Sequence, residues 1–89
     1  VPDAVSLDKA YPNPFNPSTK LSFDIPAEMH VNLAVYDISG RLVDQLVNEV
    51  RSASPYTEVW NANSHASGVY FVRAESANGM SVQKVMLMK

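Results

Sequence analysis

The sequence contains no cysteine, only three glycines and no marked excess of either charge. Without cysteine the chain can form neither a disulfide framework nor a thiolate metal site. Three glycines are too few for a glycine-rich phosphate-binding loop. The net charge of −2 combines charges of both signs, so there is no basic patch with which to bind nucleic acid. No apolar run approaches the roughly 20 residues of a membrane-spanning helix.

The length and the apolar content are those of one small folded domain. A chain of 89 residues, 46% of them hydrophobic, can bury roughly 60–65% of the surface that its unfolded form exposes. That is enough for a single core without disulfides or metals, and the domain is expected to be a monomer. The chain starts with Val1 rather than Met, which predicts a module of a larger protein.

Apolar and polar residues alternate with a period of two along much of the chain, which predicts half-buried antiparallel strands. The apolar positions are Leu21, Phe23 and Ile25 in one segment and Val31, Leu33 and Val35 in the next. Further strands are predicted over residues 5–11, 56–62, 68–76 and 81–89. Asn78-Gly79 favours a tight hairpin between the last two, because both residues tolerate the positive φ of a type I′ turn.

The segment RLVDQLVNEV, residues 41–50, is ambiguous. Its apolar residues fit one face of a helix as well as they fit a bulged strand. The short turn at Gly40 favours a strand, because such a turn commonly leads into an antiparallel partner. With this segment the chain has about seven short strands separated by turn signals, the pattern of an antiparallel β-sandwich without a long helix.

The stretch YPNPFNPST, residues 11–19, combines three prolines and two asparagines with one phenylalanine. Proline fixes φ and asparagine side chains can close turns, so the segment is predicted to be a stiff loop between the first two strands. Phe15 is expected to fold back as a plug over one end of the core. The alternative is that Phe15 is an exposed anchor for a partner.

The sequence shows no constellation of catalytic or metal-binding residues. His30 and His65 stand alone and are expected to be surface loop residues. No serine lies in a nucleophile-elbow pattern, and the scattered aspartates do not form a calcium-binding loop. The chain is therefore predicted not to be an enzyme and to have no cofactor.

The aromatic residues allow two interpretations. Trp60 and Tyr70 are expected in the core, whereas Phe71 alternates with Arg73 and Glu75 and should point outwards or lie under a loop. Alternatively, several rings could form a sugar-stacking platform, as in carbohydrate-binding modules with sandwich folds. That alternative requires a flat row of exposed aromatic side chains.

A series of motifs, taken together, resembles one known family. The motifs are YPNPFNPST, LAVYDISGRLVDQLV, VWNA, SGVYFVRAES and a terminal QKVMLMK. In this order they resemble the type A C-terminal sorting domain of the type IX secretion system, over residues 7–89; residues 1–6 would be a linker from the parent protein. The resemblance implies an immunoglobulin-like sandwich of seven strands and a non-catalytic export signal. The rival interpretations are an immunoglobulin-like spacer and a carbohydrate-binding module.

The resemblance also implies a route and partners. The parent protein would cross the inner membrane by a signal peptide, pass through the periplasm and be threaded through an outer-membrane translocon. A surface peptidase usually removes the domain, and the cargo stays at the cell surface or becomes extracellular. The family's characteristic residues, carried over by position as candidates for translocon recognition, are Tyr11, Pro12, Asn13, Pro14, Gly68, Tyr70, Lys84 and Lys89.

Two features leave alternatives open. The family usually has an apolar residue two positions before the tryptophan, where this chain has Glu58. Either the strand is shifted so that Val59 faces inwards, or Glu58 lies at the margin of a sheet. The final strand carries apolar residues on both faces, so its second face is either covered by loops or contacts the secretion machinery.

Overall fold

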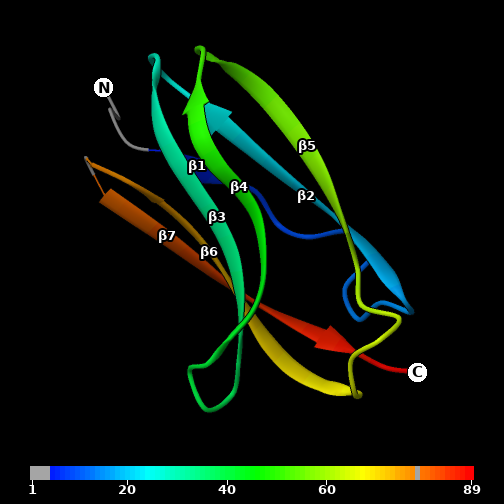
Figure 1. Cartoon of the computed structure of the whole chain (residues 1–89). Helices are drawn as coiled ribbons and strands as arrows, with labels where there is room; N and C mark the ends of the chain where they lie inside the picture. The colour runs from blue at the N-terminus through cyan, green and yellow to red at the C-terminus, as the bar shows by residue number, and fades with distance from the viewer. Residues whose placement is uncertain (1–4, 78) are drawn as a thin grey trace.

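The computed structural model describes residues 5–77 and 79–89, which form seven strands and no helix. The strands are β1 (Ser6–Leu7), β2 (Ser18–Ile25), β3 (Met29–Asp37), β4 (Leu42–Arg51), β5 (Ser54–Asn61), β6 (Gly68–Ser76) and β7 (Gly79–Leu87). They pair antiparallel in a three-stranded sheet of order β1-β2-β5 and a four-stranded sheet of order β4-β3-β6-β7. The two sheets enclose one core (Figure 1), which confirms the predicted all-β sandwich.

The topology is immunoglobulin-like with one difference. In the constant-type immunoglobulin sandwich the fourth strand lies beside the fifth, whereas here β4 lies beside β3 in the four-stranded sheet. The apolar positions predicted for β2 and β3 are all buried, as the period of two requires. Because β4 pairs with β3 and not with β5, β4 and β5 are edge strands of different sheets. The Trp60 Nε1–H of β5 donates to the Asp44 Oδ2 of β4 (3.1 Å), which connects the two sheets on this side.

The ambiguous segment 41–50 is the strand β4, as predicted, and two bulges explain why its sequence resembles a helix. In the pairing with β3, Leu46 and Val43 each have no opposite residue, because the register shifts once beside Leu33 and once beside Val35. Each extra residue interrupts the alternation of faces. The apolar residues of β4 consequently follow neither a strict period of two nor a true helical period.

β1 is shorter than the strand predicted over residues 5–11. Leu7 pairs with Phe23 and Tyr11 forms an isolated bridge with Lys20. From Leu7 to Tyr11 the first segment advances by four residues, whereas its partner β2 advances by only three, from Phe23 to Lys20. The extra residue is a bulge, which ends the regular ladder. Val5 is already buried in the core, while residues 1–4 lie outside the described part, so the linker over 1–6 stays a prediction.

The hairpin of β6 and β7 is present, with Ser76 opposite Gly79 and Gly68 opposite Leu87. Asn78 lies outside the described residues, so the turn type assigned to Asn78-Gly79 stays a prediction. Val85 and Leu87 of β7 are completely buried. The other face of β7 is exposed at every second residue from Met80 to Met88, so none of the described loops covers this face.

Phe15 is 2% exposed and Trp60 is 1% exposed, which confirms that Phe15 is a plug rather than an exposed anchor. Their ring centroids are 5.5 Å apart at an interplanar angle of 55°. Trp60 also meets the ring of Tyr70 edge to face, with the ring centroids 5.3 Å apart. Burying such rings is among the larger stabilising contributions in a core of this size.

The register of β5 is not shifted. Trp60 points into the core, whereas Val59 is 58% exposed. Glu58 therefore lies on the inward face but at its margin, where it is half-buried and its carboxylate is 3.9 Å from the Arg51 guanidinium. The position that is usually apolar in the family is thus occupied by one partner of an ion pair at an edge strand.

Candidate functional site

Seven of the eight residues carried over from the family lie at or next to one end of the sandwich, and the eighth, Lys84, touches the same loop through its carbonyl oxygen. We use the name loop end for three segments at that end, residues 11–17, 62–67 and 88–89. The Ala62 N–H donates to the Pro17 carbonyl (2.8 Å), and the Lys89 N–H donates to Ser67 Oγ (3.0 Å). In Figure 1 the C-terminus lies beside the β5–β6 connection, in agreement with these contacts.

The proline loop, residues 11–17, is held at several points. Tyr11 exchanges two backbone hydrogen bonds with Lys20, and the buried Thr19 hydroxyl donates to the Pro12 carbonyl (2.7 Å). The peptide bonds that precede the three prolines are all cis. Phe15 then inserts into the core, so the exposed face of the loop is presented from a fixed backbone. Tyr11 is 78% exposed and offers the most accessible aromatic ring.

Gly68 and Tyr70 shape the start of β6. Gly68 has a φ of 153°, a backbone conformation that residues with a Cβ atom rarely adopt. A Cβ atom at this position would nevertheless meet no other atom within 4 Å. Tyr70 is buried, and its hydroxyl donates to the Ala66 carbonyl (2.6 Å), an arrangement like the tyrosine corner of immunoglobulin-like folds. Both residues therefore set the geometry of the loop end rather than present a side chain.

The two lysines are exposed but differ in their environments. Lys84 lies on the outer face of β7, opposite Phe71, and no salt bridge connects it to the described residues. Lys89 follows β7, and its Nζ donates to the Asn63 carbonyl of the β5–β6 connection (2.7 Å). The Lys84 side chain is thus exposed to solvent, while the Lys89 side chain is placed against the loop end.

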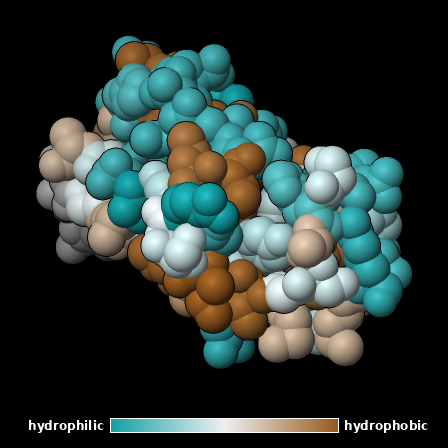
Figure 2. Space-filling model, turned by 60° about the horizontal axis from the view of Figure 1, so that its bottom comes forward, coloured by the Kyte–Doolittle hydropathy of each residue, from teal (hydrophilic) through white to brown (hydrophobic). Residues whose placement is uncertain are grey.

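A groove that the sequence did not indicate lies on the outer face of the four-stranded sheet. It has a volume of about 400 Å³ and its walls include Tyr36, Ile38, Phe71, Arg73 and Val82. Arg73 donates to the Tyr36 hydroxyl (2.7 Å) and its guanidinium lies 4.5 Å above the centre of that ring. Figure 2 shows hydrophobic side chains gathered near the middle of one face with hydrophilic residues around them.

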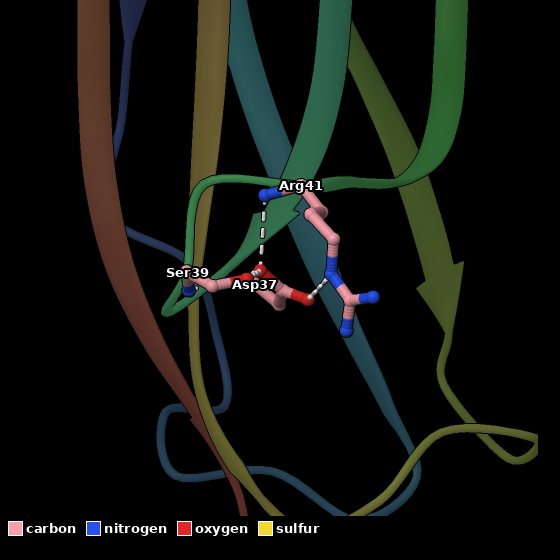
Figure 3. Close-up of polar contacts among 3 residues, drawn as sticks. All are labelled: Asp37, Ser39 and Arg41. Atoms are coloured by element: carbon pink, nitrogen blue, oxygen red, sulfur yellow. Dashed lines mark hydrogen bonds and ion pairs between the residues drawn. The ribbon is translucent and has the colours of Figure 1, made fainter.

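One wall of this groove is the turn between β3 and β4, which is organised by Asp37 (Figure 3). Its Oδ1 accepts hydrogen bonds from the Ser39 hydroxyl (2.6 Å) and from the backbone N–H groups of Ser39 and Arg41. These bonds, with a smaller contribution from the Arg41 charge, lower the pKa of Asp37 from 3.8 to about 2. Gly40 supplies the positive φ of 88° that the turn needs. The DISGR sequence, with aspartate two residues before serine, is a local signal for such a turn.

The histidines and carboxylates of the described residues are dispersed over the fold. No group of three or more His, Asp or Glu side chains among them could hold a metal ion. His30 is at the surface as predicted, but it lies on β3 and not in a loop. His65 lies in the loop between β5 and β6 as predicted, but it is half-buried against the rings of Trp60 and Tyr70. No helix in the described part of the chain could cross a membrane.

The aromatic side chains also do not form the row that a sugar platform requires. Tyr11 alone is strongly exposed among the described aromatic residues, and Tyr36 and Phe71 are half-buried beside each other. The outward direction predicted for Phe71 is confirmed. Fold and surface together define a small β-sandwich domain whose loop end is anchored to the core at Phe15 and Thr19.

Comparison with known families makes the assignment specific. The family model described as the secretion system C-terminal sorting domain matches residues 9–88, so the chain belongs to this family of type IX sorting domains. Such domains are secretion signals and are in general non-catalytic; they act with the type IX machinery in export across the outer membrane. Searches of curated proteins and of solved structures gave no significant match.

Proposed function

We propose that this domain is the export address of a secreted parent protein and that the outer-membrane translocon recognises it at the loop end. The observation that carries the proposal is the placement of the family's characteristic residues. Tyr11 to Pro14, Gly68 and Lys89 come from distant parts of the sequence and are exposed around one end of the fold.

In this proposal the translocon is a machine that accepts unrelated cargoes. Such a machine must bind a shape that every cargo shares, and a rigid surface loses little conformational entropy when it is bound. The proline loop meets this requirement, because Phe15 and the Thr19–Pro12 hydrogen bond fix it to the core. Lys84 and Lys89 add two cations beside it, which favours a partner surface with complementary negative charge.

In this proposal the parent protein reaches the periplasm by its own signal peptide, and the domain folds there as a monomer. The translocon binds the folded domain and passes the parent through the outer membrane. A surface peptidase then cleaves the domain from the cargo, which stays at the cell surface or is released. Tyr70 and Gly68 contribute by shaping the loop end, and no residue of the domain takes part in the cleavage chemistry.

The test is an export assay in a host that has the secretion system. The intact domain is fused to a fluorescent cargo with a signal peptide, and fluorescence is measured in the periplasm and outside the cell. The double variant Lys84→Ala/Lys89→Ala should accumulate in the periplasm while its thermal melting midpoint stays near that of the wild type, because both side chains are exposed.

The matched control is Lys9→Ala/Lys20→Ala, which removes the same charge from two other exposed lysines. It should be exported like the wild type. Periplasmic retention of the wild-type fusion would refute the export address itself. Normal export of the Lys84/Lys89 variant would refute only the part of the proposal that assigns recognition to these lysines.

A further inference from the structure

The strand β7 is at the edge of the four-stranded sheet, because β6 is its only partner strand among the described residues. Backbone groups on the outer side of an edge strand can pair with any extended chain that approaches them. From Lys84 to Met88, however, this side of β7 is not open. The proline loop lies along it, and Phe15 forms a parallel bridge with Leu87.

Four hydrogen bonds join the loop to the edge. The Phe15 N–H donates to the Met86 carbonyl and the Met88 N–H donates to the Phe15 carbonyl, each at 3.0 Å. The Met86 N–H donates to Asn13 Oδ1 (3.0 Å), and Asn13 Nδ2 donates to the Lys84 carbonyl (3.3 Å). A carboxamide carries an acceptor and donors in one plane, so Asn13 offers the strand the same groups as a peptide bond would.

The position of Asn13 explains why a side chain performs this role. Its neighbour Pro14 has no N–H and cannot donate to a strand. On one side the Pro12 carbonyl is held by the buried Thr19, and on the other side Phe15 is fixed in the core. The Asn13 carboxamide is therefore presented to β7 from a backbone that is anchored both before and after it.

We propose that Asn13 is a positioning residue whose carboxamide completes the cover over the edge of β7 and withholds that edge from a second copy of this chain. The second copy is the expected occupant because the side chains next to this edge are exposed and apolar, namely Val82, Met86 and Met88. Two β7 strands paired edge to edge would bring these residues together and would bury them. The proposal does not depend on the export function.

The experiment compares Asn13→Ala with Asn16→Ala. Asn16 is exposed in the same loop, and its side chain makes no hydrogen bond to another described residue. In Asn13→Ala the amide of Met86 should exchange with solvent several-fold to roughly ten-fold faster, because one hydrogen bond is lost. The amide of Met88 should keep its protection, since its acceptor is the Phe15 carbonyl. Sedimentation over a dilution series should show a dimer of Asn13→Ala and a monomer of Asn16→Ala.

Three outcomes would overturn the proposal: unchanged exchange at Met86 in Asn13→Ala, a strictly monomeric Asn13→Ala, or the same dimerisation in Asn16→Ala. A measurement on the wild type keeps the test decisive if the variant does not fold. Alternation along β7 directs the Val82 N–H to the same edge, beyond the reach of the loop contacts. Met86 should then exchange more slowly than Val82, and equal exchange rates would show that the edge is not covered.

Discussion

Replacement of Trp60 by alanine is the most demanding test of the core. The Trp60 ring contacts Phe15 and Tyr70, and its N–H donates to Asp44. Deleting a buried tryptophan costs about 3–5 kcal/mol, through the lost apolar transfer and the cavity left behind. The total stability of a domain this small is roughly 5–15 kcal/mol, so one substitution should remove a large share of it.

The measurement is urea denaturation followed by circular dichroism. With an m-value of about 1.5 kcal/mol per M, the midpoint of Trp60→Ala should fall by roughly 2–3 M. The neighbour Val59 serves as the control, because it is exposed and Val59→Ala should change stability by less than about 0.5 kcal/mol. An unchanged midpoint for Trp60→Ala, or an equal shift for Val59→Ala, would refute the assignment of Trp60 to the centre of the core.

Further predictions concern the turn and the start of β6. Gly68→Ala should cost about 1 kcal/mol or more in urea denaturation, because its positive φ strains any side chain; an unchanged midpoint would argue against this backbone. Tyr70→Phe should cost about 0.5–1.5 kcal/mol, since it loses only the hydrogen bond to Ala66, and a loss as large as that of a core truncation would contradict this. Asp37→Asn should be less stable than the wild type near neutral pH. Because the folded pKa of Asp37 is lowered, the gap should close as the pH falls from 3.8 towards about 2, and a gap that urea midpoints show to be constant would refute the role of the ionised carboxylate.

The alternation of apolar residues was sufficient to predict the sandwich, because burial on one face of a strand requires a period of two. In β4 the alternation of apolar residues did not distinguish a strand from a helix. The two bulges at Val43 and Leu46 interrupt it, and they are set by the pairing with β3 and not by the segment itself. The sequence also left the register of β5 open. There the packing of Trp60 decides, and Glu58 is accommodated at the margin by Arg51.

Less of the candidate site than of the fold could be predicted from the sequence. The motif residues could be named from the resemblance, but their gathering at one end depends on contacts between distant segments. Asn13 and Met86 are 73 positions apart, and no local pattern marks a carboxamide that will bond to a strand edge. The outer groove was missed for the same reason, because Tyr36, Phe71 and Val82 become neighbours only when three strands pair.

The late position of β7 in this domain has a consequence for the order in which the domain is made and folds. A chain is synthesised from its N-terminus, so Val85 and Leu87 are the last apolar residues to reach the core that they complete. Until they arrive, one edge of β6 lacks its partner and the proline loop has no strand to cover. We therefore expect a product that is interrupted before β7 to stay open to proteases and chaperones. The core of this domain is therefore completed only after β7 has been synthesised.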